Sequence, residues 1–277
     1  MLDTTFTEDI LRRIQEAPTP REKKEVLKDC AKGRPCVVLS CGPSLNEYTP
    51  KELRDLCKDS VVISVKQAFD YVPDVSDFLI LNTWNYQKYD FAHRRPIILY
   101  EKGPTDPPVF GTHDIEFDLP NPTDLSQQLA RSGNYDDYAF DVSDTRPWGP
   151  GVLYEIGFYL AEYIGVKSIY TLGWDVGAKN TSVMPHFYDR PSPHRTRTLA
   201  RSREIRNNIE RARFLHENGV IYNKPRIIPE EVDACANASG DWFTWLASRG
   251  IDLHVVSRVA EVDPRVPRTR LEKARLR

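Results

Sequence analysis

Short, uninterrupted apolar runs alternate along the chain with longer segments of mixed polarity. The first run, residues 36–40, leads into the small-residue sequence Gly42-Pro43-Ser44. Continuous rather than alternating hydrophobicity favours strands that are covered on both faces of a parallel sheet. Five further runs have the same character: 61–65, 78–81, 97–100, 168–172 and 253–256.

Helical periodicity fills several of the intervals between these runs. It is found at residues 51–57, 151–164 and 195–216. Residues 5–31 have the same spacing ahead of the first strand, with a break at Pro18 and Pro20. Strands that alternate with helices in this way predict an α/β, Rossmann-like fold, with a doubly wound, mostly parallel sheet and an N-terminal helix.

The same pattern suggests how the chain is divided. Residues 1–32 form an N-terminal helical extension, and residues 33–264 form the α/β domain. Residues 103–144 are rich in proline and polar residues and have no long periodic segment, which predicts a lid-like insertion. Residues 265–277 are basic and predict an exposed tail.

Composition narrows the class of protein. With 277 residues, of which 40% are hydrophobic and 28% charged, the chain is an ordinary globular protein, not a disordered one or a small disulfide scaffold. The formal net charge of −2 gives no global field to attract nucleic acid or an acidic membrane. Any anion site must therefore be local.

Cysteine usage and the N-terminal sequence bear on location. The five cysteines form no C-x-x-C pair and are odd in number, which suggests neither a zinc site nor a disulfide framework. The N-terminus has no apolar signal region, and no stretch reaches the roughly 20 apolar residues that cross a bilayer. We expect a cytoplasmic protein without membrane insertion. No D-x-D sequence offers the metal site of many nucleotide-sugar enzymes.

Two loops of small residues are the strongest candidate sites. The Ser40–Leu45 loop follows the first strand, where backbone N–H groups can approach a phosphate closely. Gly149-Pro150-Gly151 leads into a helix, and Asp175 follows the strand at 168–172. Because the carboxyl ends of parallel strands share one edge, both loops point to one cleft. The alternatives are a plain strand-to-helix turn and, for Asp175, a carboxylate that caps a neighbouring turn.

These motifs carry a resemblance to a known group of enzymes. Cys-Gly-Pro-Ser-Leu together with Gly-Pro-Gly-Val-Leu-Tyr-Glu-Ile and Leu-Gly-Trp-Asp resembles the bacterial sialyltransferases of the Campylobacter lipooligosaccharide type. The related superfamily includes motility accessory factors of flagellin glycosylation and an archaeal pterin pyrophosphokinase. The resemblance covers about residues 35–225 and implies that residues 33–264 are a nucleotide-binding catalytic domain.

The resemblance also implies which residues contact substrate. Those expected at the phosphates are Cys41, Gly42, Pro43 and Ser44, and those expected at the sugar are Lys66 or Gln67 and Asn82. The residues expected at the base or ribose, or flanking the two loops, are Trp148, Gly149, Pro150, Gly151, Gly173, Trp174, Tyr188 and Arg190. Cys41 and Lys66 stand where the sialyltransferases have asparagine, and Gly149-Pro150 replaces Thr-Ser. The donor nucleotide and its sugar are therefore left open.

The sialyltransferase base is a histidine in the loop after G-x-D. The corresponding loop here holds His186 and His194, and Arg190 stands at the family's histidine position. Imidazole is suited to take a proton from an attacking hydroxyl because its pKa lies near neutrality. We favour His186, which is followed by two aromatic residues, and expect His194 to contact phosphate. Asp175 and Asp189 are the next candidates. The plain alternative is a solvated loop histidine.

The predicted 195–216 helix is rich in arginine. We interpret most of these arginines as a solvated face with Glu204 and Glu210 as helical partners, and expect one or two to neutralise a diphosphate or an anionic acceptor.

The predicted function is transfer of a sugar from a nucleotide-sugar donor to a hydroxyl acceptor, with no cofactor and no metal. One alternative is a pyrophosphokinase that uses ATP and magnesium on a small heterocyclic alcohol. Another, of a different class, is a nucleic-acid-binding or DNA-modifying protein. The acceptor (a glycan, a protein or modified nucleic acid) and a homo-oligomeric state are left open.

Overall fold

A computed structural model describes most of the chain. The described residues are 5–82, 89, 91, 94–102, 113–119, 134–147, 151–175, 186–188, 192–206, 208–220, 229–260 and 262–270; for 208, 209, 212, 216 and 229–237 this holds for the backbone alone. Trp148, Gly149, Pro150 and Arg190, four of the predicted site residues, lie outside these ranges.

The centre of the fold is a parallel sheet, which confirms the predicted class. Its strands are β1 (Pro35–Leu39), β2 (Val61–Val65), β3 (Phe78–Asn82), β4 (Ile97–Lys102), β5 (Ile115–Asp118), β6 (Ser168–Leu172) and β7 (Asp252–Val255). They lie in the order β5-β4-β3-β2-β1-β6-β7, and every pair is parallel. The chain moves outward from β1 to β5 and then returns to place β6 on the other side of β1. The boundary between β1 and β6 is thus the topological switch point, where such sheets bind ligands.

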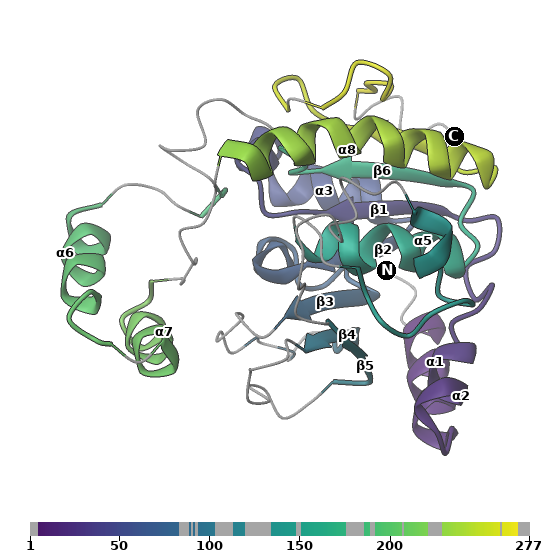
Figure 1. Cartoon of the computed structure of the whole chain (residues 1–277), viewed down its shortest axis with the longest axis horizontal. Helices are drawn as coiled ribbons and strands as arrows, with labels where there is room; N and C mark the ends of the chain where they lie inside the picture. The colour runs from purple at the N-terminus through teal and green to yellow at the C-terminus, as the bar shows by residue number, and fades with distance from the viewer. Residues whose placement is uncertain are drawn as a thin grey trace.

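Helices cover both faces of the sheet (Figure 1). On one face lie α1 (Thr5–Glu16), α8 (Pro229–Ser248) and α5 (Phe158–Tyr163), which continues from a π-helical turn, η5 (Leu153–Gly157). On the other lie α3 (Pro50–Cys57) and the 3-10 turns η1 (Pro43–Glu47) and η2 (Lys66–Tyr71). The remaining described helices are α2 (Pro20–Glu25), η4 (Tyr135–Tyr138), α6 (Pro193–Ser202) and α7 (Asn208–Glu217).

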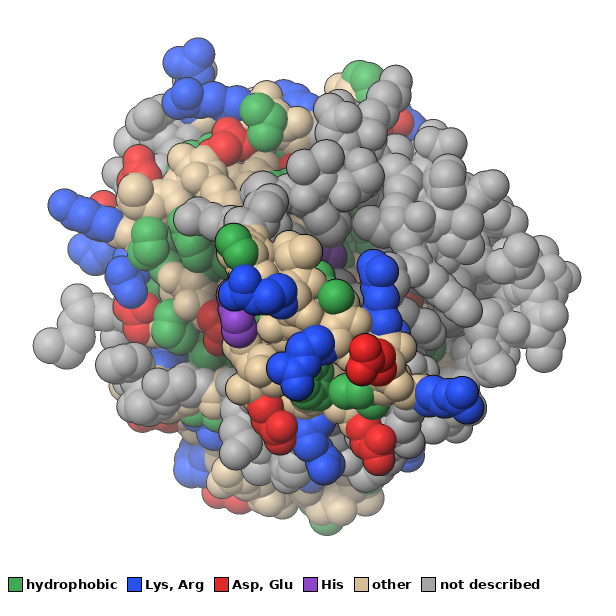
Figure 2. All heavy atoms as spheres, turned by 90° about the vertical axis from the view of Figure 1, so that its left-hand side faces the viewer, with side chains coloured by type: hydrophobic (Ala, Val, Ile, Leu, Met, Phe, Trp, Pro, Cys, Tyr) green, Lys and Arg blue, Asp and Glu red, His purple; other side chains and the backbone are tan. Residues whose placement is uncertain are grey.

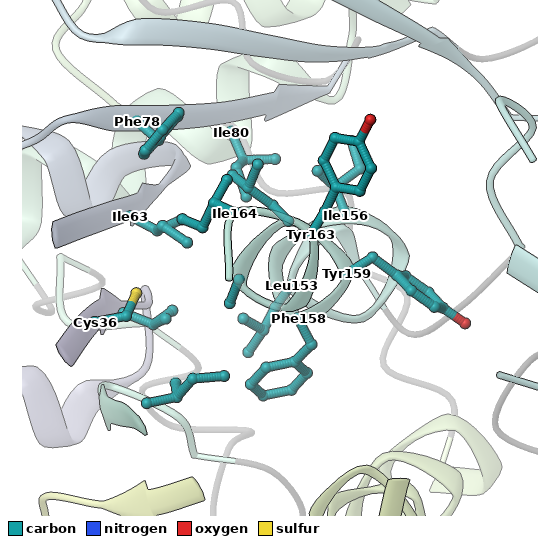
Figure 3. Packing of buried hydrophobic residues seen from close by; sticks show 14 of the residues in the cluster. Cys36, Ile63, Phe78, Ile80, Leu153, Ile156, Phe158, Tyr159, Tyr163 and Ile164 are labelled. Carbon is teal, nitrogen blue, oxygen red and sulfur yellow. The ribbon is translucent and has the colours of Figure 1, made fainter. Parts of the chain in front are cut away.

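The η5–α5 helix fixes the centre of the main hydrophobic core. Figure 3 shows Ile63, Phe78 and Ile80 on the strands pointing toward the side chains of this helix, among them Leu153 and Ile156. All five side chains are buried. Burying an aliphatic or aromatic side chain contributes about 1.5–3 kcal/mol, so this face orients the helix start firmly over the sheet.

The strand β5 was not predicted. Its residues alternate between buried and exposed, because Ile115 and Phe117 pack on the core while Glu116 and Asp118 face outward at the sheet edge. This part of the 103–144 segment therefore belongs to the sheet. Phe140 from the same segment is completely buried, so the described parts pack into the domain body.

The helices differ from the prediction at two places. The segment predicted as one helix over 195–216 is broken into α6 and α7, which fold back on each other. The Ser202 hydroxyl donates to the Leu199 carbonyl at the break, and serine and asparagine favour helix ends over interiors. The long helix α8 was not predicted. In the described part of the chain, no helix is both long and apolar enough to cross a membrane.

Candidate functional site

The Ser40–Leu45 loop meets the loop that follows β6 at the switch point, whereas Gly149 and Pro150 of the other predicted loop lie outside the described residues. The Gly42 N–H donates to the Gly173 carbonyl at 2.8 Å, and the Ser44 N–H donates to Asp175 Oδ2 at 2.8 Å. A Cβ on Gly42 would lie 2.0 Å from Asp175 Oδ2 and 2.4 Å from the Gly173 oxygen, so only glycine permits this approach. Gly173 itself has a φ of +69°, and a Cβ there would lie 2.2 Å from the Ser40 oxygen. The sequence therefore requires glycine on both sides of the contact.

The first loop differs from our prediction that its backbone N–H groups contact a phosphate. The N–H groups of Gly42 and Ser44 already have acceptors within the protein, and Pro43 has no N–H group. These groups do not form an open phosphate cradle. Burial raises the pKa of Asp175, although contacts with the Ser44 backbone and hydroxyl oppose that shift. The Asp175 carboxylate caps the start of η1, which was the alternative considered for it.

Cys41 points into the protein below this loop. Its Sγ lies 3.1 Å from the Val65 carbonyl and 3.8 Å from Gln67 Oε1. Burial raises the pKa of the Cys41 thiol to about 12, so the group stays protonated near neutral pH and is not a nucleophile. Gln67 is buried against it, so both residues form the floor of the site and neither has the exposed position expected of a ligand contact.

Polar side chains continue along the carboxyl edge of the sheet. Asn82 ends β3 and pairs in register with Glu101 of β4, and Lys66 follows β2 with a φ of +51°. From the opposite side, Glu155 of the π-helical turn lies close to Glu101. Glu101 and Glu155 are 1% and 4% exposed, so two carboxyl groups meet in a nearly dry environment. We call these two residues the acid pair.

Burial and mutual repulsion favour a protonated acid pair. Burial raises the pKa of Glu101 well above its ordinary value, and Glu155 raises it further, while the positive charges of Lys66 and Arg146 act in the opposite direction. Two close carboxylates cannot both ionise without a large cost. Sequence reasoning missed both residues. The available signal was a glutamate at the end of one apolar run and inside another, Ile97–Tyr100 and Val152–Ile156.

The raised pKa of Glu101 predicts how the stability of the protein depends on pH. Because the folded-state pKa of Glu101 exceeds the unfolded value of about 4.3, its stabilising contribution is complete below that value. The contribution is lost as the pH rises through the folded-state pKa. Glu101→Gln is expected to flatten this part of a plot of melting temperature against pH, whereas Glu8→Gln on the exposed face of α1 keeps it. An identical decline in wild type and Glu101→Gln would show that the pair holds no proton.

Trp174 follows β6, and Gly151 lies at the start of the η5–α5 helix. Trp174 is buried, its Nε1–H donates to the Tyr154 hydroxyl at 2.8 Å, and its ring packs against Phe158. It therefore ties the loop after β6 to the start of the η5–α5 helix. Gly151 has a φ of +138°, and its carbonyl accepts the N–H groups of Tyr154 and Glu155 in the first turn.

The loop with the candidate bases is anchored to the site. Phe187 donates its N–H to the Cys41 carbonyl at 2.8 Å and accepts from Asn46 Nδ2 at 3.0 Å. Beside it, the half-buried His186 ring stacks on Tyr188 with centroids 5.0 Å apart and planes 10° apart. The structure therefore brings His186 and Tyr188 to the rim of the first loop.

His194 has a different position. It is exposed on the first turn of α6, and its Nε2 lies 2.8 Å from the Asn218 carbonyl just beyond α7. This contact ties α6 to α7. The structure therefore does not bring His194 together with His186, Asp175 and the first loop.

Comparison with known proteins adds little beyond the fold. No family model matches the chain, and no curated protein matches it significantly. One similar solved structure is the MAf glycosyltransferase from Magnetospirillum magneticum AMB-1, with a TM-score of 0.34 and 14% sequence identity. The match covers 65% of this chain and only 29% of that one. At this level, the likeness carries no argument about function, which rests on the site.

Proposed function

We propose that this protein is a glycosyltransferase that moves a sugar from a nucleotide-sugar donor to a hydroxyl acceptor without an obligatory metal. The observation that carries the proposal is the meeting of the β1 and β6 loops at the switch point, where Gly42 contacts Gly173 and Ser44 contacts Asp175. Ligands of open parallel sheets bind outside the carboxyl ends of the strands at this boundary.

The residues around the boundary suit such a reaction. Lys66 follows β2 at the same edge and supplies a positive charge for a departing phosphate, a role that the loop backbone does not fill. His186 stands at the rim, where an acceptor hydroxyl would enter, and acts as the general base. We expect Asn82, at the end of β3, to hydrogen-bond the donor sugar, as the resemblance implies.

A thermal-shift screen against CMP, UDP, GDP, ADP and their sugar conjugates tests the proposal. A ligand at 100 times its dissociation constant adds about 2.7 kcal/mol of stability, so one nucleotide and its conjugate are expected to raise the melting temperature clearly. Lys66→Gln is expected to weaken that response, while Lys58→Gln on the exposed end of α3 leaves it unchanged. The absence of a shift with every nucleotide would refute the proposal.

The metal requirement separates the two enzyme hypotheses. We expect turnover of the bound nucleotide sugar to be the same in EDTA and in magnesium. Transfer between phosphates normally needs the ion to neutralise charge. Loss of activity in EDTA that magnesium restores, with ATP as the stabilising nucleotide, would favour the pyrophosphokinase alternative.

A further inference from the structure

The helices α6 and α7 form a basic hairpin that stands away from the sheet (Figure 1). Ser192 caps α6 by accepting the Arg195 N–H, and the two helices are held together by the contact between His194 and Asn218 and by Arg201, whose guanidinium lies 5.8 Å from the Phe214 ring centre. We call residues 192–220 the arginine hairpin. In the sequence it follows closely on His186, which lies at the rim of the site.

The charge of the arginine hairpin contrasts with that of the whole chain. It contains seven arginines, no lysine and three glutamates, and so has a net charge of +4 in a protein whose formal net charge is −2. Blue side chains project from the middle of the face that Figure 2 shows, on the side where α6 and α7 lie in Figure 1. The hairpin therefore has a local excess of positive charge, although acidic side chains lie among the basic ones on this face.

Much of this charge is not neutralised by the residues that the structure describes. Four arginines of the hairpin are exposed and form neither an ion pair nor a ring contact with any residue that the structure describes: Arg197, Arg203, Arg206 and Arg213. We predicted glutamate partners for most of the hairpin arginines, and for these four the described residues supply none. Four guanidinium groups on one small hairpin that lack a partner among the described residues favour binding of a molecule with several negative charges.

We propose that the arginine hairpin binds the phosphate backbone of a nucleic acid and presents a hydroxyl of that polymer to the switch-point site. The role of the nucleic acid as acceptor rests on the proposed transferase function. Its binding to the hairpin does not depend on that function. Guanidinium groups bind phosphate oxygens in a bidentate manner, which explains arginine in preference to lysine. A duplex carries one charge per roughly 1.7 Å, so a ten-residue helix of about 15 Å spans several phosphates.

The surface fits a membrane poorly. Interfacial helices need an apolar face beside their basic one. Among the described side chains, the large hydrophobic ones that are exposed are Val142 and Val259, and neither lies in the hairpin. An acidic protein remains a rival partner, and the test distinguishes it.

The test measures fluorescence anisotropy of labelled 20-nucleotide single-stranded and duplex DNA and RNA against salt concentration. The fourfold variant Arg197→Gln, Arg203→Gln, Arg206→Gln, Arg213→Gln is expected to bind at least 10-fold more weakly at low salt. Its slope of log K against log salt should flatten by up to about 3.6 for a duplex, because each of the four lost phosphate contacts contributes about 0.9. The matched control neutralises four exposed cations elsewhere: Lys28, Lys51, Lys58 and Arg258. It is expected to bind nearly as the wild type does.

The outcomes separate this inference from the proposed function. No binding to any of these nucleic acids at 50 mM salt, or equal losses in the two fourfold variants, would overturn the inference. Competition by poly-L-glutamate as strong as that by unlabelled DNA would also overturn it, in favour of an acidic protein. Nucleic-acid binding without any nucleotide response in the thermal-shift screen would retain the hairpin assignment and refute the transferase.

Discussion

Replacing His186 by alanine is expected to lower kcat by roughly 10² to 10⁴, the usual effect of removing a general base. Its neighbour Phe187 is tied to the Cys41 carbonyl and to Asn46, so the loop backbone should hold its place when the imidazole is removed. Nucleotide affinity should change little. The measurement is turnover of the nucleotide sugar identified in the thermal-shift screen, together with its dissociation constant.

His194→Ala is the matched control for this result. Because His194 contacts the Asn218 carbonyl, its loss is expected to loosen the arginine hairpin and to leave the rate of the chemical step nearly unchanged. We had expected His194 to contact phosphate, and weaker donor binding with an intact hairpin would support that earlier interpretation. Full kcat in both variants would remove histidine from the mechanism and make Asp175 or Asp189 the next candidate.

Gly42→Val is expected to destabilise the protein by about 3–5 kcal/mol. Gly42 has an ordinary φ of −66°, so the cost comes from crowding and not from backbone strain. The new side chain would overlap Asp175 Oδ2 and the Gly173 carbonyl, which separates the two loops and breaks their hydrogen bonds. At about 2–4 °C per kcal/mol, the melting temperature should fall by roughly 10 °C.

Gly250→Ala serves as the control for Gly42→Val. Gly250 has a φ of +76° but no atom within 4 Å of a new Cβ, so the substitution adds strain of about 1 kcal/mol and no overlap. A Gly42→Val protein that melts with the control would mean that the loops are not in contact in solution. Loss of ligand binding in Gly42→Val would by itself say nothing about a phosphate contact, since the variant damages the site.

Most of the sheet could be predicted because its strands are buried on both faces. A run such as Val61–Val65 has no polar face, so its hydrophobicity alone indicates a central strand. The edge strand β5 was not predicted because only Ile115 and Phe117 of its four residues are apolar. The helix α8 was not predicted because Gly240 and Asp241 interrupt the helical spacing of its apolar residues. Its place is fixed instead by buried rings such as Trp242.

The candidate site could be predicted only in part. That the first loop lies beside Asp175 follows from parallel strands and their shared carboxyl edge, without any knowledge of side-chain packing. The acid pair could not be predicted in this way. Glu101 and Glu155 are neighbours only because the η5 turn packs over the sheet, where it contacts β2 and β3, and helix placement over a sheet is a property of the whole core.

The position of β1 in the sheet has a consequence for folding on the ribosome. β1 pairs with β2 soon after it is made, but its other edge waits for β6, and Leu39 finds Leu172 only after most of the chain has been synthesised. Closing so long a loop is slow, and an uncovered edge of an apolar strand invites pairing with other chains in the meantime. The nascent chain is therefore most prone to aggregation before β6 emerges, and the switch-point loops are among the last parts of the domain to be assembled.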